Sequence, residues 1–220
     1  MVRPGPSAGG RPPVATPARL AAALGHRLPP RAARIGLLGG SFNPAHGGHL
    51  HISREALKRL NLDEVWWLVA PQNPLKAQDC MAPLAERLQG ARGIAKDRRI
   101  RVSPLEALLG TERTAASLAL LTGRLPGRRF VWLMGADNMI GIDRWHDWPR
   151  IFALLPVAVL ARPSYSVRAS SSKAAVRLRK GRLPEVQARR LADWPTPAWV
   201  LLRCRLSSLS ATKLRQARKG

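Results

Sequence analysis

The sequence predicts an α/β protein built on an open, doubly wound parallel sheet with helices on both faces. Beyond residue 31, strand-like and helix-like segments alternate along the chain, which is typical of parallel strands joined by crossover helices. The strand-like segments are apolar runs, as expected of strands that helices cover on both faces. The chain has 220 residues, of which 45% are hydrophobic, so it can bury one sizeable core. We place this single domain at residues 32–220.

Apolar, β-branched and aromatic runs predict strands at residues 34–38, 64–70, 100–102, 129–135, 157–161 and 199–204. Helices are predicted at residues 50–60, 82–95 and 114–121, and again from about residue 211. In such sheets a ligand lies beyond the carboxyl ends of the strands, where the strand order reverses. The segments 39–49, 72–76 and 136–148 leave those ends as loops, so we expect all three to face one crevice.

Residues 1–31 are predicted to be a disordered extension rich in Pro, Ala and Arg, with a short helix at residues 15–24. Prolines from Pro4 to Pro17 prevent the start of this segment from forming the amphipathic helix of an organelle-targeting leader.

The net charge is +24, from 37 Lys and Arg against 13 Asp and Glu. This charge is consistent with a nucleic-acid partner. However, the basic residues are dispersed, and most tryptophans lie inside apolar runs rather than on a stacking surface. We therefore disfavour nucleic acid, and attribute the charge to attraction of an anionic substrate and to compositional drift towards Arg, Ala and Pro.

Cysteine usage and hydropathy indicate the compartment. Cys80 and Cys204 have no metal-ligand spacing and are expected to be buried free thiols of a cytoplasmic protein. No apolar stretch approaches the ~20 residues of a membrane span, so no membrane association is predicted. Nothing in the sequence indicates the oligomeric state.

Residues 36–50 form the most informative segment, because an apolar strand is followed by glycines, a turn and the start of a helix. Glycine lets the backbone approach an anion closely, and a helix N-terminus directs N–H groups and positive dipole towards it. His46 and His49 stand at that helix start and can donate hydrogen bonds. With His51 they could also ligate a metal. Since no carboxylate or cysteine lies nearby in sequence, the pattern favours phosphate binding.

The run GGSFNPAHGGH at residues 39–49 resembles the signature of the His-x-x-His nucleotidyltransferases. Residues 66–71, and the stretch from 135–137 to 162–165, resemble the nicotinate-nucleotide adenylyltransferases of that superfamily more than its pantetheine-phosphate adenylyltransferases. Near the C-terminus, LSATKLR at residues 209–215 resembles the family element Ile-Ser-Ser-Thr-x-Ile-Arg. Such a Ser/Thr helix cap offers hydroxyl and N–H groups to phosphates.

The resemblance implies adenylyl transfer from ATP to nicotinate mononucleotide, yielding nicotinate adenine dinucleotide and pyrophosphate. It makes His46, His49 and Lys76 the catalytic residues, with His49 at the α-phosphate and His46 at the attacking or leaving phosphates. Phosphate beside them is expected to favour protonated imidazoles. The implied ATP-binding residues are Gly39, Gly40, Ser41, Phe42, His49, Gly135, Asp137, Ser210, Thr212 and Arg215.

The mononucleotide is expected at Asn73, Thr114 and Trp145, whose indole could stack on the pyridine ring. Mg²⁺ would arrive with the ATP phosphates. We expect no direct side-chain ligand for it, with Asp137 as the one carboxylate that could lie near.

The sequence departs from the family pattern at Arg113, Ala116 and Ala211, where Tyr, Asp and Ser are usual. The first two leave the binding mode of the second substrate open. An adenylyltransferase of nicotinamide mononucleotide or phosphopantetheine therefore stays an alternative. So does a different class of protein, a basic nucleic-acid-binding protein on the same fold, because fold alone does not determine function.

Overall fold

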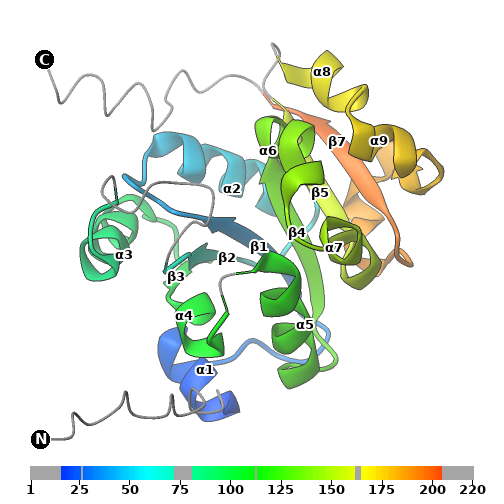
Figure 1. The fold of residues 1–220 in the computed structure, drawn as a ribbon. Coiled ribbons are helices and arrows are strands. Elements are labelled where there is room, and N and C mark those ends of the chain that lie inside the picture. The colour runs from blue at the N-terminus through cyan, green and yellow to red at the C-terminus, as the bar shows by residue number, and fades with distance from the viewer. Residues whose placement is uncertain (1–15, 26, 72–80, 112, 162–164, 205–220) are drawn as a thin grey trace, which may run out of the picture.

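Parallel strands form one seven-stranded sheet in the computed structural model, which describes residues 16–25, 27–71, 81–111, 113–161 and 165–204 (Figure 1). The strands are β1 (Arg34–Gly40), β2 (Glu64–Val69), β3 (Ile100–Ser103), β4 (Arg129–Gly135), β5 (Val157–Ala161), β6 (Arg182–Leu183) and β7 (Trp199–Arg203). Their order is β3-β2-β1-β4-β5-β7-β6, and each hydrogen-bonded pair is parallel.

Sequence order reverses between β1 and β4, so this is the doubly wound sheet that the sequence predicts. All of the predicted strands are confirmed. The strand β6 lies outside the predictions, because two residues are too few to show a period.

Three predicted helices are confirmed as α2 (Gly47–Arg59), α3 (Leu84–Ile94) and α5 (Thr114–Arg124), while the one predicted from about residue 211 lies outside the described residues. Further short helices are α4 (Leu105–Leu109), α6 (Ala136–Gly141), α7 (Trp148–Leu154), α8 (Ser166–Ser170), α9 (Lys173–Arg177) and the 3₁₀ segments η2 (Ile142–Arg144), η4 (Arg179–Gly181) and η5 (Glu185–Asp193). The loop predicted at residues 136–148 is therefore wrong over 136–144. Helices this short do not repeat an apolar face, so periodicity misses them.

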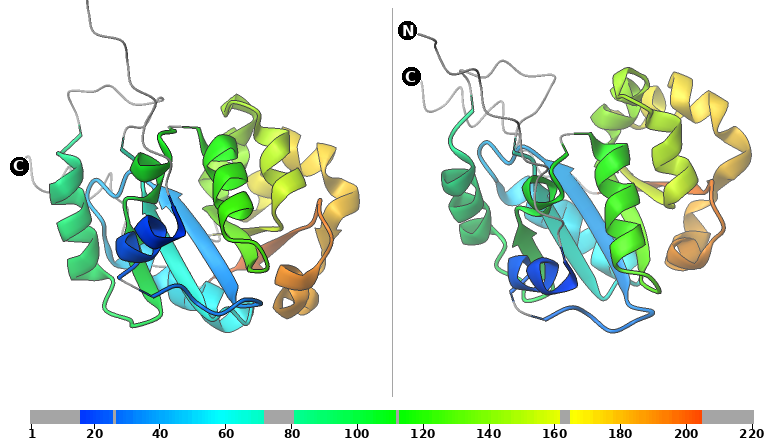
Figure 2. Two further views of the ribbon diagram at one scale, coloured as in Figure 1. Left: turned by 90° about the horizontal axis from the view of Figure 1, so that it is seen from below. Right: turned by 60° about the horizontal axis from the view of Figure 1, so that its bottom comes forward.

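Each face of the sheet carries its own layer of apolar core. Helices α2 and α3 and segment η5 cover one face. Helices α4 to α9, with α1 (Pro17–Ala23), cover the other, and Figure 2 shows α1, α4 and α5 together on that side. Adjacent residues of a strand point to opposite faces. Trp66 and Trp67 of β2 follow this rule, since both are fully buried and each belongs to a different layer.

The described part of the predicted N-terminal extension, residues 16–25 and 27–31, packs on the domain. Thr16 caps α1 by accepting a hydrogen bond from the Arg19 amide, and Leu20 and Leu24 are buried in the core. The Arg101 guanidinium of β3 donates to the Leu24 carbonyl at 2.9 Å. The expected short helix is thus present, whereas the expected disorder does not hold for this part. Two leucines four residues apart on one helix face bury enough apolar surface to fix it.

Among the described residues, no helix combines the length and the apolar character that a membrane span requires.

Candidate active site

The described part of the predicted phosphate-binding site lies at the carboxyl edge of the sheet, where the strand order reverses. Strand β1 ends at Gly40 and leads into α2, and its neighbour β4 ends at Gly135 and leads into α6. Because β1 and β4 lie side by side and run parallel, both helix starts lie at one edge, on opposite faces of the sheet. The structure therefore brings the segments 39–49 and 135–137 together, as the sequence predicts.

His46 and His49 cap the first turn of α2 reciprocally. The Gly48 amide donates to His46 Nδ1 at 3.1 Å, and the His46 amide donates to His49 Nδ1 at 3.2 Å. The two ring centroids lie 3.9 Å apart. His46 is 6% exposed and has an extended backbone, as an N-cap residue requires. Two backbone N–H groups that would otherwise lack helical partners are thereby satisfied.

This cap indicates which nitrogen carries the proton when each ring is neutral. An Nδ1 atom that accepts a hydrogen bond from an amide carries no proton, so each neutral imidazole holds its proton on Nε2. Protonation of Nδ1 would replace each acceptor by a donor and break the cap. The imidazolium form that we expect beside bound phosphate stays a prediction, and the cap concerns the rings in their neutral form.

The His49 ring packs against the aromatic rings of Phe42 and Trp67. Phe42 is 2% exposed and stacks on Trp67 at 5.0 Å between ring centroids, and its ring lies 4.7 Å from that of His49. Its backbone has a φ of 46°, which is rare for a residue with a side chain. The Phe42 ring is thus a packing group, and only its backbone N–H could serve the predicted phosphate loop.

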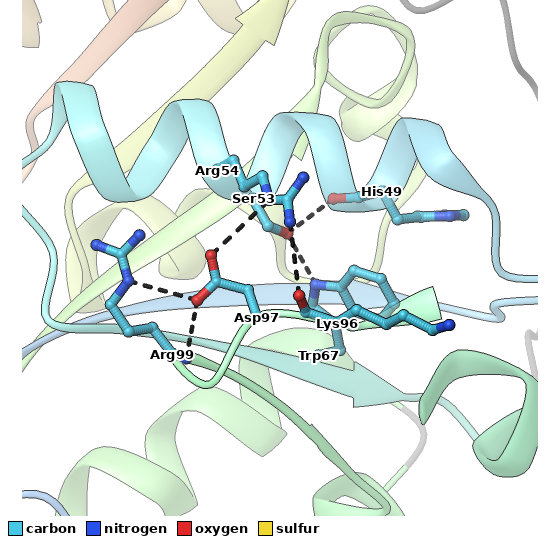
Figure 3. A network of polar contacts seen from close by, with 7 residues as sticks. All are labelled: His49, Ser53, Arg54, Trp67, Lys96, Asp97 and Arg99. Atoms are coloured by element: carbon cyan, nitrogen blue, oxygen red, sulfur yellow. Dashed lines mark hydrogen bonds and ion pairs between the residues drawn. The ribbon is translucent and has the colours of Figure 1, made fainter. Parts of the chain in front are cut away.

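A polar relay fixes the same turn of α2 to the sheet (Figure 3). The Ser53 hydroxyl donates to the His49 carbonyl and accepts from the Trp67 indole N–H, both at 2.8 Å. The next residue, Arg54, reaches the Lys96 carbonyl at 3.5 Å and the Asp97 carboxylate at 3.8 Å. These contacts hold α2 against β2 and the segment that precedes β3.

The two glycines at the end of β1 differ in whether the structure has room for a side chain at their positions. A Cβ atom at Gly39 would lie 2.4 Å from Cη2 of the Trp132 ring, whereas one at Gly40 would meet only ordinary contacts, the nearest at 3.4 Å from Phe42. Trp132 is almost fully buried. Packing of this indole therefore explains the missing side chain at Gly39, which we predicted to contact ATP.

Gly135 and Asp137 lie where β4 passes into α6, at the same edge of the sheet. A Cβ atom at Gly135 would lie 2.4 Å from Oδ1 of Asp137, so the exposed carboxylate folds back over the glycine. A side chain at residue 135 would displace this carboxylate, which lies in the first turn of α6.

Two of the predicted mononucleotide contacts come from neighbouring segments. Thr114 is the first residue of α5, and Trp145 follows η2 and is partly buried against the core. Nη1 of Arg113 lies 3.1 Å from Nε2 of His146, so the residues preceding Thr114 and following Trp145 are in direct contact. Arg113, which departs from the family pattern, thus joins the two segments.

Several predicted site residues, namely Asn73, Lys76, Ser210, Thr212 and Arg215, lie outside the described residues. Within the described ranges, no three His, Cys, Asp or Glu side chains gather as a metal site.

Sequence reasoning missed two buried ionisable residues, Arg87 and Glu106, which are 4% and 5% exposed. Desolvation lowers the pKa of Arg87, and it raises the pKa of Glu106 to about 7. Charged residues in a helix are usually solvated, so the local sequence carries no sign of their burial.

Fold and site together define an α/β protein of the nucleotidyltransferase class. A model of the cytidylyltransferase-like family matches residues 37–217. A probable nicotinate-nucleotide adenylyltransferase of Methylorubrum extorquens is 52% identical over 83% of this chain and 98% of its own length. One of Cereibacter sphaeroides is 52% identical over 82% of this chain and 94% of its own length. The chain therefore belongs to the nicotinate-nucleotide adenylyltransferases within the cytidylyltransferase-like family.

The fold is also similar to that of a solved structure, the nicotinic acid mononucleotide adenylyltransferase of Plasmodium falciparum complexed with NaAD. The TM-score is 0.61, at 15% sequence identity over 84% of this chain and 83% of that one.

Proposed function

We propose that this protein transfers the adenylyl group of ATP to nicotinate mononucleotide. A phosphate oxygen of the mononucleotide attacks the α-phosphorus of ATP and forms the new P–O bond, while the bond to the β-phosphate breaks and pyrophosphate leaves. The products are nicotinate adenine dinucleotide and pyrophosphate. The reaction needs no nucleophile from the protein, so catalysis rests on alignment of two polyanions and on stabilisation of the charge that builds on their oxygens.

The observation that supports this function most directly is the reciprocal histidine cap at the strand-order reversal. It holds Nδ1 of each ring on the helix backbone, which leaves Nε2 as the nitrogen that can donate to a phosphate. We assign His49 to the α-phosphate and His46 to the attacking or leaving phosphates. An Nε2–H donor stabilises a phosphate oxygen in the transition state through a charge-assisted hydrogen bond.

The remaining roles follow from the family resemblance. Backbone N–H groups of residues 40–42 would bind the triphosphate, with Lys76 as the cation at the reaction centre. The element with Ser210, Thr212 and Arg215 would hold the β- and γ-phosphates. Asn73, Thr114 and Trp145 would hold the nicotinate ring, and N–H donors near them would select its carboxylate over an amide.

A divalent metal, Mg²⁺ in our proposal, fits this site as a companion of ATP. Mg²⁺ keeps several waters and binds through phosphates and one or two carboxylates. The described residues provide no three-ligand cluster, and Asp137 offers one exposed carboxylate at this edge of the sheet. Bound there, the metal would neutralise triphosphate charge. Cys204 is a buried free thiol, in keeping with the cytoplasmic location that we propose.

Product analysis tests the function. The full chain is incubated with ATP, Mg²⁺ and, separately, nicotinate mononucleotide, nicotinamide mononucleotide or phosphopantetheine, and the products are identified by mass. We expect nicotinate adenine dinucleotide as the main product. A product from one of the other acceptors alone would reassign the substrate. No product, together with nucleic-acid binding that falls steeply with salt, would replace the enzyme by the nucleic-acid-binding alternative.

A further inference from the structure

Arg87 is a buried cation whose partners are carbonyl oxygens of three separate chain segments. It lies in the first half of α3 and is 4% exposed. Its Nε donates to the Ala82 carbonyl at 2.8 Å. Nη1 donates to the carbonyls of Ser41 at 2.8 Å and Ala70 at 2.7 Å, and Nη2 donates to that of Pro71 at 2.9 Å.

These carbonyls mark the exits of two neighbouring strands. Ser41 directly follows β1 and belongs to the predicted phosphate loop, and residues 70 and 71 directly follow β2, where the segment with Asn73 and Lys76 begins. Ala82 precedes α3, so it lies where the chain returns from that segment. The two exits are also bonded to each other, because the Ala70 amide donates to the Gly40 carbonyl at 2.9 Å. One guanidinium thus joins both loops to α3.

The geometry requires an arginine. A guanidinium presents five N–H groups in a rigid plane, which suits several acceptors in fixed directions, while the three donors of a lysine ammonium diverge from one point. A buried charge is costly for stability, and apolar replacements of buried ionic groups are often neutral or stabilising. Hydrophobic packing alone would therefore fill this space more simply. All of the acceptors of Arg87 are backbone carbonyls, so it fixes the backbone where the chain leaves the two strands.

We propose that Arg87 is a positioning residue, which sets where the chain leaves β1, at Ser41, relative to where it leaves β2, at Ala70 and Pro71. The inference deepens the proposed function, since the loops after β1 and β2 carry the groups assigned to ATP and to the mononucleotide. Adenylyl transfer needs the attacking oxygen and the α-phosphorus in line, and a misplacement of about 1 Å can lower the rate about 10²-fold. Each loop alone still binds its own ligand, so loss of Arg87 lowers kcat more than it raises KM.

Two variants, Arg87→Lys and Arg87→Met, are compared with the wild type and with Arg92→Lys, an exposed arginine on the same helix. The first readout is amide hydrogen exchange in the ligand-free protein, which does not depend on the proposed function. Exchange of the Ala70 amide probes the hydrogen bond between the ends of β1 and β2. Exchange of the Cys204 amide, which donates to the Ala161 carbonyl, probes the ends of β5 and β7 elsewhere in the sheet. We expect exchange at Ala70 to rise at least tenfold in both Arg87 variants, with Cys204 unchanged.

The second readout is steady-state kinetics at a temperature well below unfolding. We expect kcat to fall at least tenfold in both Arg87 variants, each KM to change less than threefold, and Arg92→Lys to match the wild type. A kcat within twofold of the wild type, or equal acceleration of exchange at both amides, overturns the proposal. Failure of both variants to fold also overturns it, because Arg87 then serves folding. A wild type that makes no dinucleotide contradicts the proposed function, while the exchange experiment still decides whether Arg87 fixes the two strand ends.

Discussion

Replacing His46 by asparagine separates the two roles that the structure gives this residue. In the wild type, Nδ1 of His46 accepts the Gly48 amide at 3.1 Å, and Nε2 carries the proton offered to phosphate. Asparagine is among the best N-cap residues, and its side-chain oxygen can accept the same amide. His46→Asn therefore keeps the cap and removes the Nε2–H donor. The backbone bond from residue 46 to His49 Nδ1 is unaffected by the side chain.

The expected changes in stability and in kcat follow from the cap that is kept and the donor that is lost. Because one good cap replaces another, the free energy of unfolding should stay within about 0.5 kcal/mol of the wild type. Loss of one preorganised donor should lower kcat about 10²- to 10³-fold, or about 2.7–4 kcal/mol of transition-state stabilisation. His46→Ala is the matched variant, since it loses the cap as well and should unfold with about 1 kcal/mol less free energy at a similar kcat.

The assay combines urea unfolding with the rate of pyrophosphate release from ATP and nicotinate mononucleotide. If His46→Asn kept at least half of the wild-type kcat, the imidazole would have no part in catalysis. If His46→Asn lost as much stability as His46→Ala, the hydrogen bond from the Gly48 amide to the side chain of residue 46 would not contribute to stability.

Three further predictions concern the packing at Gly39, the hydrogen bonds of Ser53 and the buried carboxyl group of Glu106. Gly39→Ala should lower the free energy of unfolding by about 1–3 kcal/mol, because its Cβ would lie 2.4 Å from a buried Trp132 ring. In the same urea titration, Gly40→Ala should stay within about 1 kcal/mol of the wild type. Equal losses of stability in the two variants would contradict this packing. Ser53→Ala should cost about 1–3 kcal/mol by leaving a buried indole N–H without its acceptor, and a stability equal to that of the wild type would refute the relay. Burial raises the pKa of Glu106 to about 7, so the folded protein keeps a proton that the unfolded chain releases, and stability falls as pH rises from about 4.5 to about 7. Glu106→Gln should therefore gain up to about 3 kcal/mol over the wild type between pH ~4 and pH ~8, and a gain that does not change with pH would disprove the assignment.

Much of the fold follows from local patterns. The strands are apolar runs that need burial on both faces, and the longer helices repeat an apolar face often enough to be recognised, as α2 and α5 illustrate. Short helices such as α6 carry too few residues for that signal. α1 was expected, but its docking was not, because two leucines do not indicate which surface they will cover.

Some features of the candidate site also follow from the sequence, while others depend on the tertiary structure. The sequence by itself determined the pairing of His46 with His49 at a helix start, because residues three apart on one turn meet wherever that helix lies. It also determined which loops leave the strands and therefore which edge of the sheet they share.

Only the tertiary structure decided the packing reason for Gly39 and the burial of Arg87. Each depends on atoms brought together by folding, such as the ring of Trp132 or the carbonyl of Ser41, which lies 46 residues from Arg87. Contacts across such separations are fixed by how strands and helices pack. A charged residue in an amphipathic helix therefore looks like a solvated one until the chain is folded around it.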